Sequence, residues 1–190
     1  TFRSLSAVKK FLKGRPVLSK LAMVTRVSGS KVKRRLILDC LASGTNDHAV
    51  QWERVLLPKV LDAVHDTLEL LLLLLEDGEV VVFMVLDCVN AFYKIPLMPV
   101  EYRYFVAFFR ELFMVWLRSA QGSINGPQLF GGTSAQGSRF SQSTCPSDRV
   151  RLNAYTDGPW NAIRASAEAT RRLAARIMLM WLSLGFALAY

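Results

Sequence analysis

The sequence predicts a folded domain of the α+β class, and three observations support this prediction. The chain has 190 residues, of which 52% are apolar and 21% are charged, so it can form a substantial core and lacks the composition of a disordered chain. Two segments, residues 57–75 and 166–184, carry apolar side chains at helical spacing. A third segment, residues 80–86, is an apolar run rich in β-branched residues, which is typical of a buried strand.

The first predicted helix begins near Pro58, a residue that suits the first turn of a helix. Its apolar residues recur every three or four positions, and acidic residues occupy the other side. The apolar set is Val60, Leu61, Val64, Leu68, Leu71, Leu72 and Leu75. The acidic segment 76–79 then ends the helix.

The last predicted helix is capped by Ser166 and has Glu168 in its first turn. Ile177 and Trp181 lie on its apolar face, and Gly185 is a natural stop.

Two predicted strands end at aspartates. Asp87 follows the run 80–86, and Asp39 follows a shorter run at Leu36–Leu38. An aspartate that ends a buried strand is either a satisfied core carboxylate or a site residue at the edge of a sheet. The segment Tyr102–Phe109 fits a strand or a helix, and the Gly-, Ser- and Gln-rich segment Gly122–Gly137 predicts a loop.

Cysteines and apolar runs limit the class of protein. The three cysteines and two histidines have no paired ligand spacing, which argues against a disulfide scaffold or a zinc module and favours a reducing, intracellular compartment such as cytoplasm or nucleus. The apolar runs Leu70–Leu75 and Ile177–Tyr190 are shorter than the roughly 20 residues of a spanning helix, and no secretory signal follows the N-terminal lysines. We therefore expect no membrane partner. A chain that begins at Thr1 suggests a fragment.

Positive charge is concentrated at the N-terminus. Residues 1–35 hold eleven basic residues and no acidic one, within a chain of net charge +9. Such a stretch is typical of a surface that binds a polyanion, and a solvated basic arm is the alternative.

Three segments resemble the palm of retroelement reverse transcriptases (RNA-directed DNA polymerases). They are VLDCVNAFYKIPL at Val85–Leu97, AQGSINGPQLFG at Ala120–Gly131 and LNAYTDGPWNAI at Leu152–Ile163. KVKRRLILDCLASGTN, at Lys31–Asn46, resembles the basic fingers strand of that family, and the final LSLGFALAY resembles the segment after the palm helix. Because these motifs occur in the same order as in that family, few unrelated sequences would match them by chance.

The resemblance implies an antiparallel palm sheet backed by helices, with a basic fingers region and no thumb. It implies fingers-like segments at residues 1–79 and 98–120 and palm-like segments at 80–97 and 121–190. It also implies that Asp87 and Asp157 are the catalytic metal ligands, because nucleotidyl transfer uses Mg²⁺, or Mn²⁺, held by convergent carboxylates. The alternative is two unrelated surface aspartates.

Five further residues match nucleotide-binding positions of the family: Arg35, Lys33, Phe92, Gln121 and Gly122. The resemblance assigns Arg35, with Lys33 or Lys31, to the triphosphate, and Phe92 to exclusion of a ribose 2′ hydroxyl. Gln121 and Gly122 match a loop beside the incoming nucleotide. The alternatives are a solvated face for the lysines and a strand-borne core aromatic for Phe92.

The chain departs from the family pattern at three places. Gly158 stands where the family has a second aspartate, Asn90 stands where it often has an acid, and Tyr190 ends the sequence before the primer-gripping hairpin and thumb. We therefore expect a reverse-transcriptase-like domain with impaired activity, whose partners are RNA or DNA primer-template and deoxynucleoside triphosphates. The alternatives are an inactive remnant that binds nucleic acid without specificity and a peripheral membrane protein.

Overall fold

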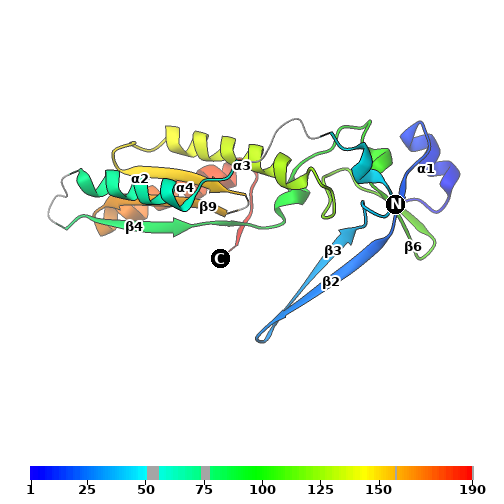
Figure 1. Ribbon diagram of the computed structural model, residues 1–190, viewed down its shortest axis with the longest axis horizontal. Coiled ribbons are helices and arrows are strands. Elements are labelled where there is room, and N and C mark those ends of the chain that lie inside the picture. The colour runs from blue at the N-terminus through cyan, green and yellow to red at the C-terminus, as the bar shows by residue number, and fades with distance from the viewer. Residues whose placement is uncertain (51–55, 74–77, 157, 190) are drawn as a thin grey trace. The chain divides into compact units, whose positions relative to one another are not determined.

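The computed structural model describes residues 1–50, 56–73, 78–156 and 158–189 (Figure 1). Its helices and mainly antiparallel sheets confirm the α+β class. The chain forms two compact units: unit 1 comprises Thr1–Glu53 and Phe92–Pro127, and unit 2 comprises Arg54–Ala91 and Gln128–Tyr190.

Unit 1 is built from one helix, two small sheets and short 3₁₀ helices. Its elements are α1 (Leu5–Leu12), β1 (Leu18–Ser19), β2 (Leu21–Ser28), β3 (Lys31–Leu38), β6 (Val106–Phe109) and β7 (Leu112–Val115), with 3₁₀ helices at Thr45–His48 and Tyr102–Tyr104. One sheet has the order β1-β6-β7, and β2 and β3 form a separate hairpin. The core of the unit contains Leu38, Cys40, Leu97, Phe105, Ala107 and Ala120.

The basic N-terminal stretch is folded into unit 1. Phe2 forms a bridge with Phe113, Ser4 caps α1, and Leu18 pairs with Val106. The strand expected at residues 36–38 extends back to Lys31 because β3 pairs with β2 along its whole length. A solvated arm therefore does not describe this part of the chain.

Both alternatives for Tyr102–Phe109 hold in part. A 3₁₀ turn at Tyr102–Tyr104 precedes β6, and β6 turns into β7 through Arg110 and Glu111. These two residues have φ of 47° and 63°, the left-handed pair that a tight two-residue hairpin requires.

Unit 2 is a three-stranded antiparallel sheet with helices packed against it. Its elements are α2 (Val60–Leu72), β4 (Val80–Val85), β5 (Asp87–Cys88), α3 (Gly126–Ser143), β8 (Val150–Tyr155), β9 (Gly158–Ala165), α4 (Ala167–Ser183) and β10 (Leu188–Ala189). The sheet has the order β4-β9-β8, and β5 pairs with β10. The 3₁₀ helix Ala91–Lys94 and the first residues of α3 connect the two units.

The helix α2 covers one face of the sheet. Arg151 on β8 donates a hydrogen bond to Glu69 on α2 at 2.7 Å, and Asn153 donates one to Asp66 at 2.5 Å. Val150 and Ile163, which pair across β8 and β9 and share the opposite face, are fully buried, and α4 contacts β9. The central strand β9 is thus buried on both faces.

Two expectations are wrong. The run 80–86 is not a buried strand, because β4 lies at the edge of the sheet and Val80, Phe83 and Val85 are exposed. The segment Gly122–Gly137 is not simply a loop, because most of it belongs to α3. Its small residues let α3 approach α4 closely: a Cβ at Gly137 would lie 2.9 Å from the Trp181 ring.

The two predicted helices of unit 2 are confirmed as α2 and α4, while positions 74 and 75 of the first prediction lie outside the described residues. The apolar side chains that predicted α2 are largely exposed, because its acidic residues Asp66 and Glu69 face the sheet. Ser166 accepts a hydrogen bond from the Ala169 amide, and the amides of Gly185 and Phe186 donate to Leu182 and Trp181 in a Schellman motif at the end of α4. Gly185 has φ of 86°, which favours glycine. Within the described ranges, no helix is both long and apolar enough to cross a membrane.

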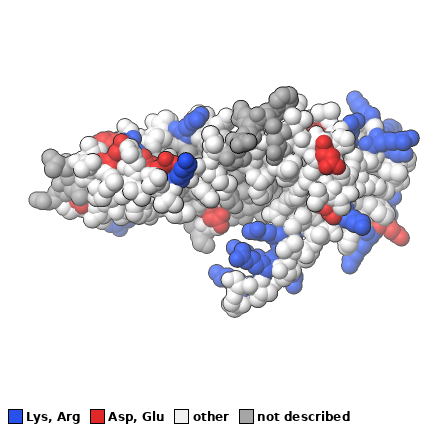
Figure 2. Space-filling view, viewed as in Figure 1, with Lys and Arg blue, Asp and Glu red and all other residues white. Residues whose placement is uncertain are grey.

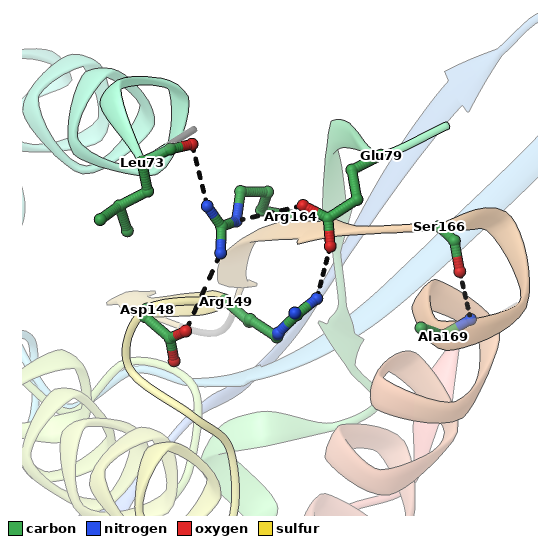
Figure 3. Close-up of polar contacts among 7 residues, drawn as sticks. All are labelled: Leu73, Glu79, Asp148, Arg149, Arg164, Ser166 and Ala169. Carbon is green, nitrogen blue, oxygen red and sulfur yellow. Dashed lines mark hydrogen bonds and ion pairs between the residues drawn. The ribbon is translucent and has the colours of Figure 1, made fainter. Parts of the chain in front are cut away.

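A buried ion-pair network joins the ends of α2, β4, β8 and β9 (Figure 3). Glu79, whose side chain is 5% exposed, binds Arg149 at 2.5 Å and lies 3.7 Å from Nε of Arg164. The Arg164 guanidinium, 8% exposed, also donates to the Leu73 carbonyl at 2.9 Å and lies 3.8 Å from Asp148. Glu79 therefore pairs with two arginines, and the buried part of the network is Glu79 with Arg164, because Arg149 and Asp148 are partly exposed.

Substitution of Gly137 by Ala should destabilise unit 2. The added methyl group meets the rigid Trp181 ring, and overpacking of this kind costs about 1–3 kcal/mol. Gly132, on the same helix, has no atom within 4 Å of its Cβ position, so Gly132→Ala should stabilise the chain by roughly 0.5–1 kcal/mol. Urea unfolding of both variants measures the difference; equal stabilities would contradict the observed packing of α3 on α4.

Substitution of Glu79 by Gln should also destabilise unit 2. The change leaves Arg149 and Arg164 without their shared carboxylate, and breaking a buried ion pair costs about 3–5 kcal/mol. The matched control is Glu168→Gln, which removes an exposed pair with Arg172 and should cost less than about 1 kcal/mol. Chemical denaturation compares the two; a Glu79→Gln cost as small as the control would mean that the network is solvated.

Candidate active site

Asp87 lies where the edge strand of unit 2 ends. Val85 pairs with Trp160, the Leu86 amide donates to the Pro159 carbonyl at 2.9 Å, and Asp87 then pairs with Ala189. Leu86 and Cys88 are buried while Asp87 is exposed, as alternation along an extended chain dictates. Its carboxylate has no hydrogen bond or ion pair within the part of the chain that the structure describes. Asp87 is therefore a carboxylate at the sheet edge and not a satisfied core residue.

The hairpin that contains the Tyr-Thr-Asp-Gly sequence ends beside this strand. Tyr155 pairs with Gly158 across β8 and β9, and Asp157 lies outside the described residues. A Cβ at Gly158 would lie 3.6 Å from the Leu86 carbonyl oxygen. Gly158, which follows Asp157, therefore lies close to Leu86, which precedes Asp87. The distance between the carboxylates of Asp87 and Asp157 stays a prediction.

Asn90 has a conformational reason to occupy its position. It follows β5 with φ of 55°, a left-handed conformation that Asn adopts more readily than most residues. The neighbouring Val89 amide donates to the Ala187 carbonyl at 2.8 Å. Asn90 therefore shapes the turn that leads from Asp87 into unit 1.

The β2–β3 hairpin of unit 1 has one cationic and one apolar face. Residues opposite each other in the register share a face, so the pair Val24–Arg35 lies with the pairs Arg26–Lys33 and Ser28–Lys31. These six residues line a concave surface with a volume of about 350 Å³. The other face carries Met23, Val27, Val32 and Leu36 beside Thr25 and Arg34. In Figure 2 Lys and Arg side chains accordingly lie along one side of the hairpin.

The hairpin places the predicted triphosphate residues Arg35, Lys33 and Lys31 on one face and adds one more cation, Arg26. Lys33 and Arg35 are exposed on one face, two positions apart, and Arg26 lies directly opposite Lys33. Arg26 was not among the residues predicted for this face. The signal that could have found it is the Gly29 turn flanked by extended residues, which fixes the pairing of the strands.

The Gln121–Gly122 loop is attached to the end of β3. The Leu38 amide donates to the Gln121 carbonyl at 2.8 Å, and Asn46 donates to the Gly122 carbonyl and accepts from the Ile124 amide. Gly122 has φ of 112°, and a Cβ there would lie 1.9 Å from the Leu38 carbonyl oxygen. Only glycine fits this close approach of two backbones.

Phe92 belongs to the 3₁₀ helix Ala91–Lys94, so the alternative of a strand-borne core aromatic is wrong. Its ring lies against Gly126, whose Cβ position is 3.4 Å from Phe92 Cδ1. The next residue, Tyr93, donates its hydroxyl to the Leu36 carbonyl of β3 at 2.9 Å. Burial raises the pKa of the Tyr93 hydroxyl above its usual value. The five predicted nucleotide-binding residues thus all lie in unit 1, with Lys33 and Arg35 on β3 and Gln121 and Gly122 attached to its Leu38 end.

Asp39 and Cys40 have local roles. The Asp39 carboxylate accepts a hydrogen bond from the Ala42 amide at 3.0 Å and so stabilises the turn after β3. Burial, with a smaller contribution from the Asp39 charge, raises the pKa of the Cys40 thiol to about 11. Cys40 is therefore a protonated core residue at neutral pH.

One cluster with metal-ligand chemistry lies on α2. Ligand atoms of His65, Asp66 and Glu69 gather within 4.8 Å of one another. Asp66 already accepts from Asn153, and Glu69 is paired with Arg151. The contacts of these two carboxylates are explained by the packing of α2 on the sheet, so we assign no metal to this cluster.

The fold is that of a reverse-transcriptase-like protein, with a palm-like antiparallel sheet in unit 2 and a basic hairpin in unit 1. No protein-family model matches the chain, and no curated protein sequence matches it. Solved structures of foamy virus protease-reverse transcriptase do match it in three dimensions.

Three of these structures illustrate the similarity. The foamy viral protease-reverse transcriptase dRH in complex with double-stranded DNA matches 90% of this chain with a TM-score of 0.63 and 17% identity. Another complex of the foamy viral enzyme with double-stranded DNA matches 90% at a TM-score of 0.61 and 17% identity. The native prototype foamy virus protein matches 92% at a TM-score of 0.57 and 16% identity. This chain spans 26%, 31% and 21% of those chains, respectively.

Proposed function

We propose that the chain is a reverse-transcriptase-like domain whose site is built for template-directed addition of deoxynucleotides. The observation that carries this proposal is the approach of the hairpin turn to the end of β4, where the Cβ position of Gly158 lies 3.6 Å from the Leu86 carbonyl oxygen. That approach supports convergence of the two aspartates that adjoin these residues, Asp87 and Asp157. The similarity to foamy virus protease-reverse transcriptase supports the same class of protein.

Asp87 fits the role of a metal ligand because its carboxylate is exposed and has no partner in the described ranges. Mg²⁺, or Mn²⁺, held by Asp87 and Asp157 would act as a Lewis acid on the triphosphate and on the attacking 3′ oxygen. Arg35 and Lys33 bind the triphosphate oxygens, for which guanidinium and ammonium groups are suited. Phe92 excludes a ribose 2′ hydroxyl, and the Gln121–Gly122 backbone lies beside the nucleotide.

Gly158 limits the chemistry of this site. A second carboxylate in the turn would add negative charge beside two divalent cations, and its absence lowers metal affinity and stabilisation of the transition state. The backbone does not require glycine here, because Gly158 is outside the left-handed region and its Cβ position has only ordinary contacts at 3.6 Å. An aspartate therefore fits at this position.

Substitution of Gly158 by Asp should raise primer extension by roughly 10 to 100-fold, the effect typical of a lost partner at a metal site. The assay measures incorporation of deoxynucleotides on a primed RNA template with Mg²⁺ or Mn²⁺, using the chain alone and the chain fused to a reverse-transcriptase thumb. We expect extension by the natural sequence to be very low, because its turn has one carboxylate.

Two variants complete this experiment. Gly158→Asn adds a side chain of the same shape without charge and should not raise activity, and Asp87→Asn in the Gly158→Asp background should abolish it. Robust extension by the natural sequence would exclude an inactive remnant. Absence of extension by the repaired chain with its thumb would contradict the polymerase assignment.

Binding of nucleic acid without catalysis is the second candidate function. The concave face of the hairpin, lined by Arg26, Lys31, Lys33 and Arg35, favours it. Alternate residues on one strand are spaced by about 6.6 Å, so these side chains form a short track of positive charge. Such a track suits a phosphodiester backbone and gives affinity without sequence preference.

Neutralising this track should weaken nucleic-acid binding more than neutralising the basic residues at the end of α1 and just after it. The hairpin variant changes Arg26, Lys31, Lys33 and Arg35 to Gln, and a charge-matched control changes Lys9, Lys10, Lys13 and Arg15 to Gln. If each hairpin cation contacts one phosphate of a duplex, the slope of log affinity against log salt becomes less steep by about 3.6 in the hairpin variant. The slope of the control variant should not change. Fluorescence anisotropy over a salt series measures both slopes. Equal slopes for the two variants would mean that overall charge, and not the hairpin face, binds the polyanion.

A further inference from the structure

Tyr93 joins the segment that carries Phe92 to the strand that carries Arg35. Its hydroxyl donates to the Leu36 carbonyl at 2.9 Å, across 57 positions of sequence. Phe92 precedes Tyr93 and Arg35 precedes Leu36, so the bond lies one residue from each. The contact is made within unit 1 and does not involve the aspartates of unit 2.

The segment that follows Tyr93 is held from another direction. The Ser119 amide donates to the Ile95 carbonyl at 2.8 Å, and the Leu97 amide donates to the Leu117 carbonyl at 3.1 Å. Arg118 also donates to the Lys94 carbonyl at 3.1 Å. These bonds fix residues 94–97 against residues 117–119, whereas the Tyr93 hydroxyl fixes the segment against β3.

We propose that Tyr93 is a positioning residue that sets the distance between the Phe92 ring and the triphosphate-binding face of β3, and thereby selects deoxynucleotides over ribonucleotides. The inference rests on the proposed function, because it takes Phe92 as the residue that meets the sugar. A ring that excludes a 2′ hydroxyl must be held at a fixed distance from the bound triphosphate, since a small outward shift admits one extra oxygen atom. The Phe92 ring lies against Gly126, which limits its movement on one side, and the Tyr93 hydroxyl limits movement of the segment on the side of β3.

The hydroxyl is suited to a fixed structural bond. It is partly buried, and burial raises its pKa, so it remains a protonated donor through the neutral range. A phenylalanine at this position would keep the ring and its packing but would leave the Leu36 carbonyl without this donor. Tyr93→Phe therefore removes the bond with little change in volume.

The first measurement tests, without any ligand, whether the Tyr93 hydroxyl is shielded from solvent, as its contact with the Leu36 carbonyl implies. The chain has five tyrosines, and Tyr93 should ionise later than an ordinary tyrosine in a spectrophotometric titration of the folded protein. The late step should be absent in Tyr93→Phe and present in the control Tyr102→Phe, which removes a hydroxyl from the same unit. A titration in which Tyr93→Phe removes no late step would show that the Tyr93 hydroxyl is exposed, and would overturn the burial on which the proposal rests.

The second measurement tests nucleotide selection. Binding of dATP and ATP to the chain on a primed RNA template with Mg²⁺ is measured by competition with a fluorescent deoxynucleotide. Tyr93→Phe should lower the ratio of dATP to ATP affinity by about fivefold, the factor typical of one neutral hydrogen bond. Phe92→Ala should lower it further, and Tyr102→Phe should leave it unchanged.

The outcomes distinguish failure of the inference about Tyr93 from failure of the proposed function. The inference would be overturned if the ratio of dATP to ATP affinity were unchanged in Tyr93→Phe but lowered in Phe92→Ala. Tyr93 would then have only a structural role, and the proposed function would stand. Absence of nucleotide binding by the natural sequence, or equal affinity for dATP and ATP, would contradict the proposed function and the inference with it.

Discussion

The antiparallel pairing of β9 with both β4 and β8 is the constraint on which the geometry of unit 2 depends. The register that places Val85 opposite Trp160 also places the Tyr155–Gly158 turn beside Leu86. A slip of one residue would turn every side chain of β9 to the other face. The ion pairs of Arg164 with Glu79 and Asp148 oppose such a slip from the far end of the same strand. A polar network at one end of the sheet therefore secures the candidate site at the other.

The parts of the fold that the sequence predicted are those whose signals are local. The helices α2 and α4 follow from apolar periodicity and from caps such as Ser166, and β4 follows from its β-branched run. The helix α3 could not be predicted this way, since its Gly- and Ser-rich sequence is typical of a loop. It packs closely against α4 at Gly137, which meets Trp181 across 44 positions of sequence, a contact that no local pattern reveals. The burial of β4 was overestimated for a similar reason: an apolar run does not reveal which strand occupies the centre of a sheet.

The candidate site residues also differ in whether a local sequence signal identifies them. Asp87 carries a local signal, a carboxylate at the end of a strand, and the resemblance to reverse transcriptases supplied Arg35, Lys33 and Phe92. Arg26 was missed because its place beside Lys33 depends on hairpin register, which the composition of the two strands leaves open. The bond from Tyr93 to Leu36 joins residues 57 positions apart and carries no signal in either segment. Contacts between residues this far apart in sequence are set by tertiary packing, so the three-dimensional structure is needed to find them.

The two glycines of the site differ in what they imply. Gly122 is required by its backbone, because its φ of 112° and its approach to the Leu38 carbonyl exclude a side chain. Gly158 has no such requirement, so its proposed effect is that of a missing charge, with the register of β8, β9 and β4 unaffected. The cationic face, the Gln121–Gly122 loop and Phe92 all belong to unit 1, whereas Gly158 belongs to unit 2. The proposed binding of nucleotide or nucleic acid and the proposed catalysis therefore draw on residues of different units, and the printed contacts of the unit 1 residues are consistent with a domain that binds without polymerising.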